Sequence, residues 1–300
     1  MYFKGEGVDQ DSVEALRWYL KAARKGDAAA KFGLGFMYFK GEGVDQDYKE
    51  ALKWYLKAAR HGSSTAQRRL GSMYFKGEGV NQDYKEALKW YLKAANKRNP
   101  IAQRSLGTMY FKGEGVDQDS VEALRWYLKA AFGGDGTAQT ILGTMYVEGN
   151  IVYQDYDEAL WWYLKAAEQG DVSAQSTLGS MYFKGYGVDQ DYDEALKWYS
   201  KAAKQGDVSA QEELKQYVKS AEQGDAYAHF NLGEMYFQGE HVLQDYKQAH
   251  MWYNLAAANG HEQARVNREE LSKKMTSDQI AEAQKMAREW MEEFEKRKEE

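Results

Sequence analysis

Residues 37–59 read MYFKGEGVDQDYKEALKWYLKAA, and the same run returns at residues 73–95 with a single substitution. The Met-Tyr pair that opens the run recurs every 36 residues from Met37 to Met181, and once more at Met235. Self-similarity at a fixed period of this length is the signature of a helical solenoid, in which each unit packs mainly on its neighbours. The repeat therefore predicts a stack of similar units rather than ordinary globular domains.

Each unit reads as two helices joined by a loop. The second helix begins at Asp47, whose side chain is expected to accept a free backbone N–H while Glu50 reaches back to the Asp47 N–H, as in a capping box. Ala51, Tyr55 and Ala58 then follow the spacing of one buried stripe. The first helix is expected to begin after its own row of cap residues: Asp27, Ser63, Asn99, Asp135, Asp171, Asp207 and Asp225.

Glycines mark two places in the unit. One lies inside the first helix, at Gly71 for example, where glycine costs about 1 kcal/mol relative to alanine. We expect it to let the Trp-Tyr pair of a neighbouring helix approach the backbone closely. Two more, such as Gly41 and Gly43, occupy the loop and indicate backbone angles that other residues reach only with strain. Ile151 and His241 replace the second loop glycine, so those loops are expected to differ in shape.

These columns, written LGxMYxxGxGVxQDYxEALKWYxKAAxxGDxxAQ, resemble the Sel-1-like repeat, a relative of the tetratricopeptide repeat. The resemblance implies an all-α fold: a right-handed α-solenoid of antiparallel helix pairs in 36-residue repeats, with the first helices lining a concave groove. It also implies a non-enzymatic scaffold or adaptor, of a kind common in bacteria, that holds partner proteins in roles such as host interaction or toxin neutralisation. The family supplies no catalytic residues.

Four segments are predicted along the chain. A regular array covers residues 1–206, and its first repeat lacks its first helix. Residues 207–225 hold a repeat that has lost its loop and half of each helix, which leaves one fused helix and predicts a break in the array. Residues 226–274 hold the last repeat and an atypical half-repeat, and residues 275–300 form a C-terminal capping helix with a polar outer face.

Helical spacing places one set of first-helix positions opposite the core stripe, where they would form the floor of the groove. The set contains a periodic row of phenylalanines with Arg68 and Arg104 beside it, so we expect the groove to take an extended, partly acidic segment. Packing of the rings against the next repeat is the alternative. The candidate binding residues are Phe32, Phe36, Phe39, Arg68, Ser72, Phe75, Arg104, Thr108, Phe111, Thr144, Phe183, Phe230 and Phe237.

The function predicted from these features is a non-enzymatic protein–protein interaction scaffold that binds a partner protein or extended peptide. Variation among the repeats falls mostly on exposed first-helix positions, which is typical of a binding surface. The alternative is an envelope-associated enzyme, or a regulator of one, that acts on cell-wall material. No catalytic motif is found, and the five histidines have no metal-ligand spacing, so no cofactor or metal is predicted.

Composition also limits the kinds of partner that the chain is expected to bind. A formal net charge of −6 disfavours a nucleic-acid partner. No run of about 18 apolar residues predicts a membrane span, and no basic segment followed by an apolar one indicates a signal peptide. We therefore expect a soluble chain whose compartment and oligomeric state stay open. A start inside a repeat is compatible with truncation of a longer, periplasmic or secreted precursor.

Overall fold

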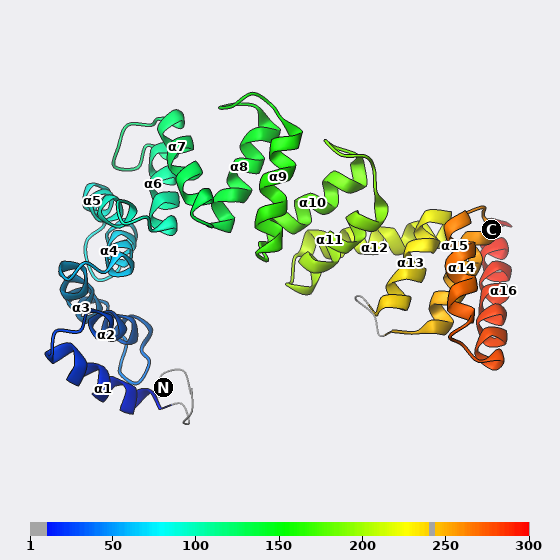
Figure 1. The fold of residues 1–300 in the computed structure, drawn as a ribbon, viewed down its shortest axis with the longest axis horizontal. Helices are drawn as coiled ribbons and strands as arrows, with labels where there is room; N and C mark the ends of the chain where they lie inside the picture. Colours follow the sequence, from blue (N-terminus) through cyan, green and yellow to red (C-terminus); the bar gives the residue numbers. More distant parts are fainter. Residues whose placement is uncertain (1–10, 240–243, 300) are drawn as a thin grey trace. The chain divides into compact units, whose positions relative to one another are not determined.

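The computed structural model describes residues 11–239 and 244–299, and within them it is all-helical, with no strand. Helices alternate with short loops, as the repeat predicts (Figure 1). They are α1 (Ser12–Arg24), α2 (Ala28–Lys40), α3 (Tyr48–Arg60), α4 (Ser64–Lys76), α5 (Tyr84–Ala95), α6 (Pro100–Lys112), α7 (Ser120–Phe132), α8 (Gly136–Glu148), α9 (Tyr156–Glu168), α10 (Val172–Lys184), α11 (Tyr192–Lys204), α12 (Val208–Glu222), α13 (Ala226–Gln238), α14 (Tyr246–Ala258), α15 (Glu262–Ser272) and α16 (Ser277–Glu299). The predicted all-α solenoid is confirmed.

The helices fall into two compact units, residues 1–155 with α1–α8 and residues 156–300 with α9–α16. In the first unit every helix packs against the next one along the chain. In that unit α1, α3 and α5 lie on one side of the stack, and α2 and α4 lie on the other (Figure 1). The tightest pairs are a first helix with the second helix that follows it, such as α4 with α5.

Each second helix begins at the predicted aspartate, but only half of the expected capping box forms. Asp47 Oδ1 accepts hydrogen bonds from the backbone N–H groups of Lys49 and Glu50, at 2.8 and 2.9 Å. The Asp47 N–H donates instead to the Tyr38 carbonyl at 2.9 Å, because the loop returns alongside the end of α2. Glu50 is therefore left to accept a hydrogen bond from Lys53. The prediction that the glutamate reaches back was wrong.

The glutamine before that aspartate closes the preceding helix. Gln46 Nε2 donates to the Phe39 carbonyl at 2.9 Å, which satisfies one of the carbonyls left open at the end of α2. The same bond recurs from Gln82, Gln118, Gln154, Gln190 and Gln244. The Gln-Asp pair of each repeat thus ends one helix and starts the next.

A buried polar column ties each first helix to the helix before it. Gln67 and Gln103 are 6 % and 7 % exposed, and their amides donate to the carbonyls of Ala59 and Ala95. Buried polar groups are tolerated when they are hydrogen-bonded in this way. Gln139, Gln175 and His229 hold the same position and bond to a carbonyl at the end of the preceding helix. Lys31 bonds instead to the Gly26 carbonyl in the turn after α1, and Gln211 makes the bond to Ala203 at an exposed position.

The glycine inside the first helix has the predicted steric role at Gly35, Gly71, Gly107, Gly179 and Gly233, and the tyrosine is the residue that approaches it. A Cβ added at Gly71 would lie 2.6 Å from the Tyr91 ring, and one at Gly107 would lie 2.7 Å from the Tyr127 ring. Real Cβ atoms do not come this close to another heavy atom. The absent methyl group therefore allows α4 and α5, and α6 and α7, to pack with the ring flat against the backbone.

The turns have glycines with positive φ at the predicted positions, with two exceptions. Gly41 and Gly43 have φ angles of 75° and 71°, as expected for the left-handed region. Arg98 replaces the glycine that ends the other second helices and still has a φ of 58°, so it carries the strain that glycine avoids. Ile151 does not have a positive φ, so its loop differs in shape as predicted. His241 lies outside the described residues.

In the second unit a single helix, α12, takes the place of a helix pair. It packs against α11 before it and α13 after it. At the C-terminal end, α16 begins with a complete capping box, in which Thr276 and Gln279 exchange hydrogen bonds of 2.9 and 3.2 Å. Ala287 and Trp290 of α16 pack on α14.

We expect the substitution Gly71→Ala to lower the free energy of unfolding by about 1–3 kcal/mol, because the new methyl group overlaps the Tyr91 ring. In an open helix the same change would stabilise by up to about 1 kcal/mol. Urea unfolding of the wild type and of the variant measures the difference. In a Tyr91→Ala background the penalty disappears, and a penalty that persisted there would contradict the steric explanation.

Candidate interaction surface

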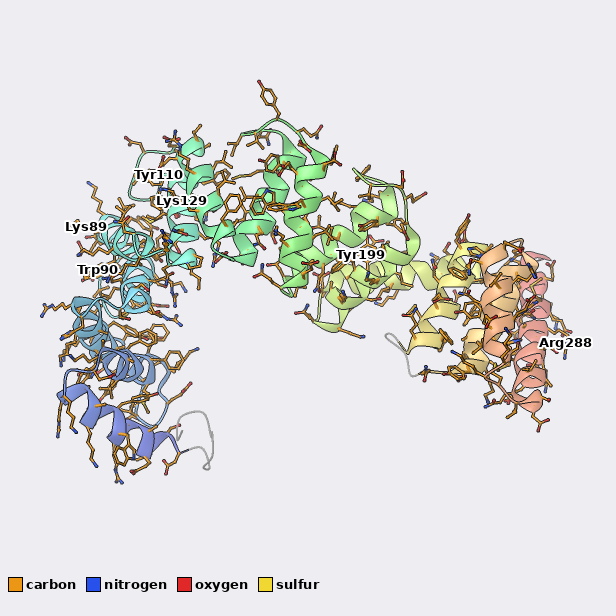
Figure 2. The ribbon with its side chains drawn as sticks, in the orientation of Figure 1. Lys89, Trp90, Tyr110, Lys129, Tyr199 and Arg288 are labelled. Carbon is orange, nitrogen blue, oxygen red and sulfur yellow. The ribbon has the colours of Figure 1, made fainter. Side chains whose placement is uncertain are left out.

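The outward side chains of α3, α5 and α7, here called the second-helix face, carry a regular row of intrahelical ion pairs. Lys53, Lys89 and Arg125 each lie within 3.0 Å of a glutamate three residues earlier. Lys89 projects outward from α5 in Figure 2. A second row of lysines covers tryptophan rings: Lys57 over Trp54 at 3.8 Å, Lys93 over Trp90 at 4.1 Å and Lys129 over Trp126 at 3.9 Å. Lys49, Arg60 and Lys85 of the same helices are exposed, and among the described residues none of them has a carboxylate within salt-bridge distance.

The outward side chains of α2, α4 and α6, here called the first-helix face, differ at two adjacent arginines. Arg68 and Arg69 of α4 are half-buried, and among the described residues neither has a carboxylate within salt-bridge distance. Burial and the neighbouring Arg69 charge lower the pKa of Arg68. The Arg69 guanidinium lies 5.8 Å from the centre of the Phe39 ring, and its Nε is buried without a hydrogen-bond partner. Two desolvated cations without an anion favour an acidic ligand.

Arg104, which the sequence analysis placed with Arg68 beside the phenylalanine row, is already paired. Its Nε donates to Asp135 Oδ1 at 2.8 Å, and the Asp135 side chain is only 6 % exposed. The same aspartate oxygen also caps α8 by accepting from the Ala138 N–H. Arg104 is therefore held inside the stack, and its charge is less available to a partner than that of Arg68 or Arg69.

Some rings of the phenylalanine row pack against neighbouring aromatic side chains, and others are more exposed. Phe39 and Phe75 each lie 5.1 Å, centroid to centroid, from a tyrosine at the start of the next helix, Tyr48 and Tyr84. Phe32 packs on Tyr55 at 5.5 Å, Phe237 packs on Tyr246 at 5.9 Å, and Phe36 is half-buried. Phe183 is also half-buried. Phe111 is the most open ring, at 41 % exposure.

Phe230 differs from the rest of the row because it is only 6 % exposed. It stacks on His261 at 4.3 Å and packs on Tyr253. It contributes to the core of the last repeat rather than to an open surface.

Small hydroxyl residues of the first-helix face form hydrogen bonds with tyrosines of the core. The Tyr127 hydroxyl donates to Thr108 Oγ1 at 3.2 Å. The Tyr91 hydroxyl is hydrogen-bonded to Ser105 and to Ser72. Thr144 is exposed, and its hydroxyl donates to the carbonyl of Thr140 in its own helix. Ser72 and Thr108 therefore serve the core as well as the surface.

Sequence reasoning missed Arg69 and the column to which it belongs. Helical spacing placed Arg68 opposite the core but did not include the next position, where Ser105 is hydrogen-bonded to Tyr91 and Asn231 is only 1 % exposed. The available signal was the doubled arginine itself, since no other repeat has two cations there. Ile101, at 40 % exposure, is a second missed surface residue.

Three histidines of the second unit, His229, His250 and His261, have local structural roles. His229 is fully buried, and its Nε2 lies 2.8 Å from the Ala221 carbonyl. Desolvation by burial lowers its pKa, against the opposing effect of that carbonyl and of Asp225. His250 is buried beside Ser272, and its pKa is also lowered by burial. His261 caps α15 by accepting from the Ala264 N–H.

These features define the class: a helical-repeat protein built from stacked helix pairs, with an exposed first-helix face. The Sel1 repeat family model matches seven segments, residues 1–27, 28–63, 64–99, 100–135, 136–171, 172–207 and 226–261. The chain belongs to the Sel1 repeat family. Sel1 repeat proteins are protein-interaction scaffolds, and the fold is generally non-enzymatic. Among the described residues, no helix is long and apolar enough to cross a membrane.

Solved structures support the assignment. A Sel1 repeat protein from Oxalobacter formigenes is 36 % identical, with a TM-score of 0.61 over 81 % of this chain and 93 % of its own. A protective antigen of uropathogenic Escherichia coli with an SLR fold is 32 % identical, with a TM-score of 0.50 over 98 % of this chain and 82 % of its own. An immunity protein from Pseudomonas aeruginosa is 23 % identical, with a TM-score of 0.44 over 78 % and 83 %. No curated protein sequence gave a match.

The buried tyrosine hydroxyls provide a matched pair of variants. Tyr55 is fully buried, and its hydroxyl has no partner, because Phe36 stands where other repeats have serine or threonine. We expect Tyr55→Phe to raise the free energy of unfolding by up to about 1 kcal/mol and Tyr127→Phe to lower it by about 0.5–1.5 kcal/mol. Urea unfolding at neutral pH measures both. Equal effects of the two variants would show that the Thr108 hydrogen bond contributes nothing.

The lowered pKa of His229 makes stability depend on pH. The neutral form is favoured in the folded state, so its contribution is complete above the unfolded-state pKa of 6.5 and is lost as the pH falls below it. Each pH unit below that value costs up to about 1.4 kcal/mol for this residue. We expect His229→Gln, which restores the residue found in five other repeats, to flatten the profile of unfolding free energy between neutral pH and mildly acidic pH.

The reciprocal variant Gln103→His serves as the control for His229. It places a buried imidazole in the same position of another repeat and should introduce a similar loss of stability at acidic pH. Profiles that are indistinguishable among the wild type and both variants would show that the buried column does not control the acid response.

Proposed function

We propose that this chain is a non-enzymatic interaction scaffold, an adaptor that binds an acidic, extended segment of a partner protein on the first-helix face of α4 and its neighbours. The observation that carries the proposal is the pair Arg68 and Arg69, two half-buried guanidinium groups without a carboxylate partner. An incoming carboxylate would supply the missing anion and accept charge-assisted hydrogen bonds.

Aromatic rings beside the arginines supply the apolar part of the surface. Phe39 lies under Arg69, and Phe75 and Phe111 continue the row toward α6. Helix axes pack about 8–10 Å apart, and an extended peptide advances about 3.3 Å per residue. Every third side chain of such a peptide would therefore meet the next ring of the row. The preferred ligand combines one or two carboxylates with apolar side chains at that spacing. Host interaction and toxin neutralisation are both roles that such a surface can serve.

The proposal is tested with a random peptide library displayed on phage, selected on the immobilised wild-type chain. We expect the selected peptides to combine Asp or Glu with Phe, Leu or Trp. A synthetic peptide of the selected sequence should bind the double variant Arg68→Ala/Arg69→Ala about 10- to 100-fold more weakly than the wild type, because two charge-assisted bonds are lost.

Arg125→Ala is the matched control, because it removes an arginine from the second-helix face that is already paired with Glu122. It should leave the affinity unchanged. Selected peptides without acidic residues, or an equal loss of affinity in the control, would reject the proposed surface. Phe111→Ala, at the most open ring, should weaken binding without affecting the fold.

A further inference from the structure

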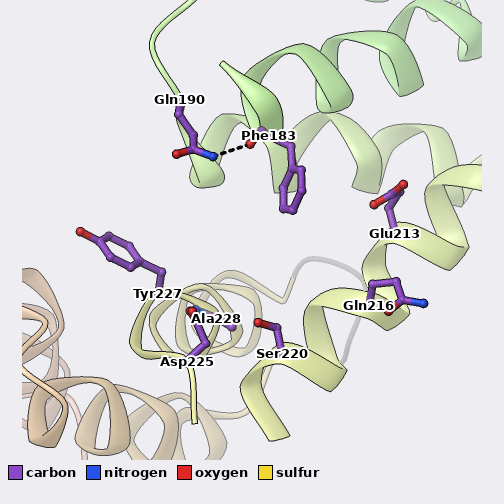
Figure 3. A pocket seen from close by; sticks show the side chains of 8 residues that line it. All are labelled: Phe183, Gln190, Glu213, Gln216, Ser220, Asp225, Tyr227 and Ala228. Atoms are coloured by element: carbon purple, nitrogen blue, oxygen red, sulfur yellow. Dashed lines mark hydrogen bonds between the residues drawn. The ribbon is translucent and has the colours of Figure 1, made fainter. Parts of the chain in front are cut away.

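A cavity of about 400 Å³ lies in the second unit where α10, α12 and α13 meet. That volume is within the range of pockets that hold a small ligand or a large side chain. In Figure 3 the Phe183 ring points into the space, α12 borders it on one side, and the start of α13 borders it on another. The lining residues are Phe183, Gln190, Glu213, Gln216, Ser220, Asp225, Tyr227 and Ala228.

The cavity is a feature of this chain rather than of the repeat. The family repeats match residues 172–207 and 226–261, and the segment between them is α12 with its following turn. Half of the lining, including Glu213 and Gln216, comes from that unmatched segment. A single helix stands there in place of a helix pair, so neighbours that ordinary repeats would cover are left facing an open space.

The lining is negatively charged and contains no cation. Glu213 and Asp225 contribute carboxylates, and among the described residues neither has a lysine or arginine within salt-bridge distance. The adjacent Glu212 differs, because it is paired with Lys215 at 3.3 Å. The charge of Glu213 reaches its surroundings: burial raises the pKa of Tyr199 to about 12, and Glu213 adds to that rise.

Aromatic and amide groups complete the lining. The Phe183 ring is half-buried, and Tyr227 is 57 % exposed and held edge-to-face against His261 at 4.9 Å. Aromatic faces attract cations. The Gln190 side-chain N–H₂ donates a hydrogen bond to the Phe183 carbonyl, as Figure 3 shows. The Gln190 amide oxygen therefore remains as an acceptor. Gln216 and Ser220 add further oxygens.

We propose that this cavity binds an arginine side chain presented by a partner protein. A guanidinium offers five donors and no acceptor, it pairs with a carboxylate through two parallel bonds, and its flat face stacks on aromatic rings. Glu213 pairs with the guanidinium, Phe183 and Tyr227 hold its faces and stem, and the amide and hydroxyl oxygens accept the remaining N–H groups. This site is separate from the Arg68–Arg69 surface, and it selects the opposite charge.

The test uses the full chain labelled with ¹⁵N and short Gly-Ser peptides that carry one central Arg, Lys, Gln or Glu. We expect the Arg peptide to give saturable shifts at the amides of Phe183, Ser220 and Tyr227, the Lys peptide to bind more weakly, and the Gln and Glu peptides to give none. Glu213→Gln should weaken the Arg peptide about tenfold. Glu212→Gln, which removes the same charge one residue away, should not.

Tyr227→Leu, at an exposed position that does not threaten the fold, should also weaken the Arg peptide. Arg68→Ala/Arg69→Ala should not affect it, so failure here and failure of the proposed function are distinguishable. Equal losses in Glu212→Gln and Glu213→Gln, or equal binding of the Gln peptide, would overturn the proposal. Tighter binding of free agmatine or spermidine than of the Arg peptide would overturn it in favour of a small cationic ligand.

Discussion

The contact between a tyrosine ring and a helix-interior glycine determines how close the two helices of each pair lie. At Gly71 and Gly107 the ring occupies the volume that a methyl group would need, so the backbone of the first helix forms the wall of the ring's pocket. The tyrosine then crosses the pair, and its hydroxyl ends beneath the first-helix face, where Thr108 accepts it. Some residues of that face, such as Thr108, therefore bind core tyrosines, whereas the neighbouring Arg68 and Arg69 stay open to a ligand.

The helix ends are satisfied by side chains within the repeat, which makes each unit nearly independent of what its surface carries. A glutamine closes the first helix, the next aspartate opens the second, and a buried glutamine ties that helix to the following unit. Because these bonds are local, the outward residues can change without disturbing the stack, as expected of a protein whose repeats contact mainly their neighbours. His229 shows the limit of this freedom, since it keeps the hydrogen bond but gives the position a titratable group.

Two surfaces of opposite charge follow from departures from the repeat. In the first unit, two adjacent arginines of α4 are half-buried without a carboxylate. In the second unit, the shortened segment around α12 opens a cavity that contains carboxylates and no cation. The regular second-helix face, in contrast, carries glutamate–lysine pairs within each helix and lysines stacked on tryptophans. In both units the residues that we propose to bind a partner lie where the sequence departs from the repeat.

The sequence by itself determined the helix pairs, the aspartate half of their caps, the loop glycines and the close approach at Gly71, because each rests on local backbone geometry or on a spacing that the repeat copies many times. It also indicated the first-helix face and named Arg68. The tertiary structure alone decided that Arg104 is paired with Asp135, that Phe230 is buried and that Arg69 lacks a partner. These facts depend on which side chain of the next repeat comes within reach, and helical spacing within one repeat carries no information about that distance. The cavity at α12 has the same origin, since the sequence showed the missing residues but only packing in three dimensions showed the space that they leave.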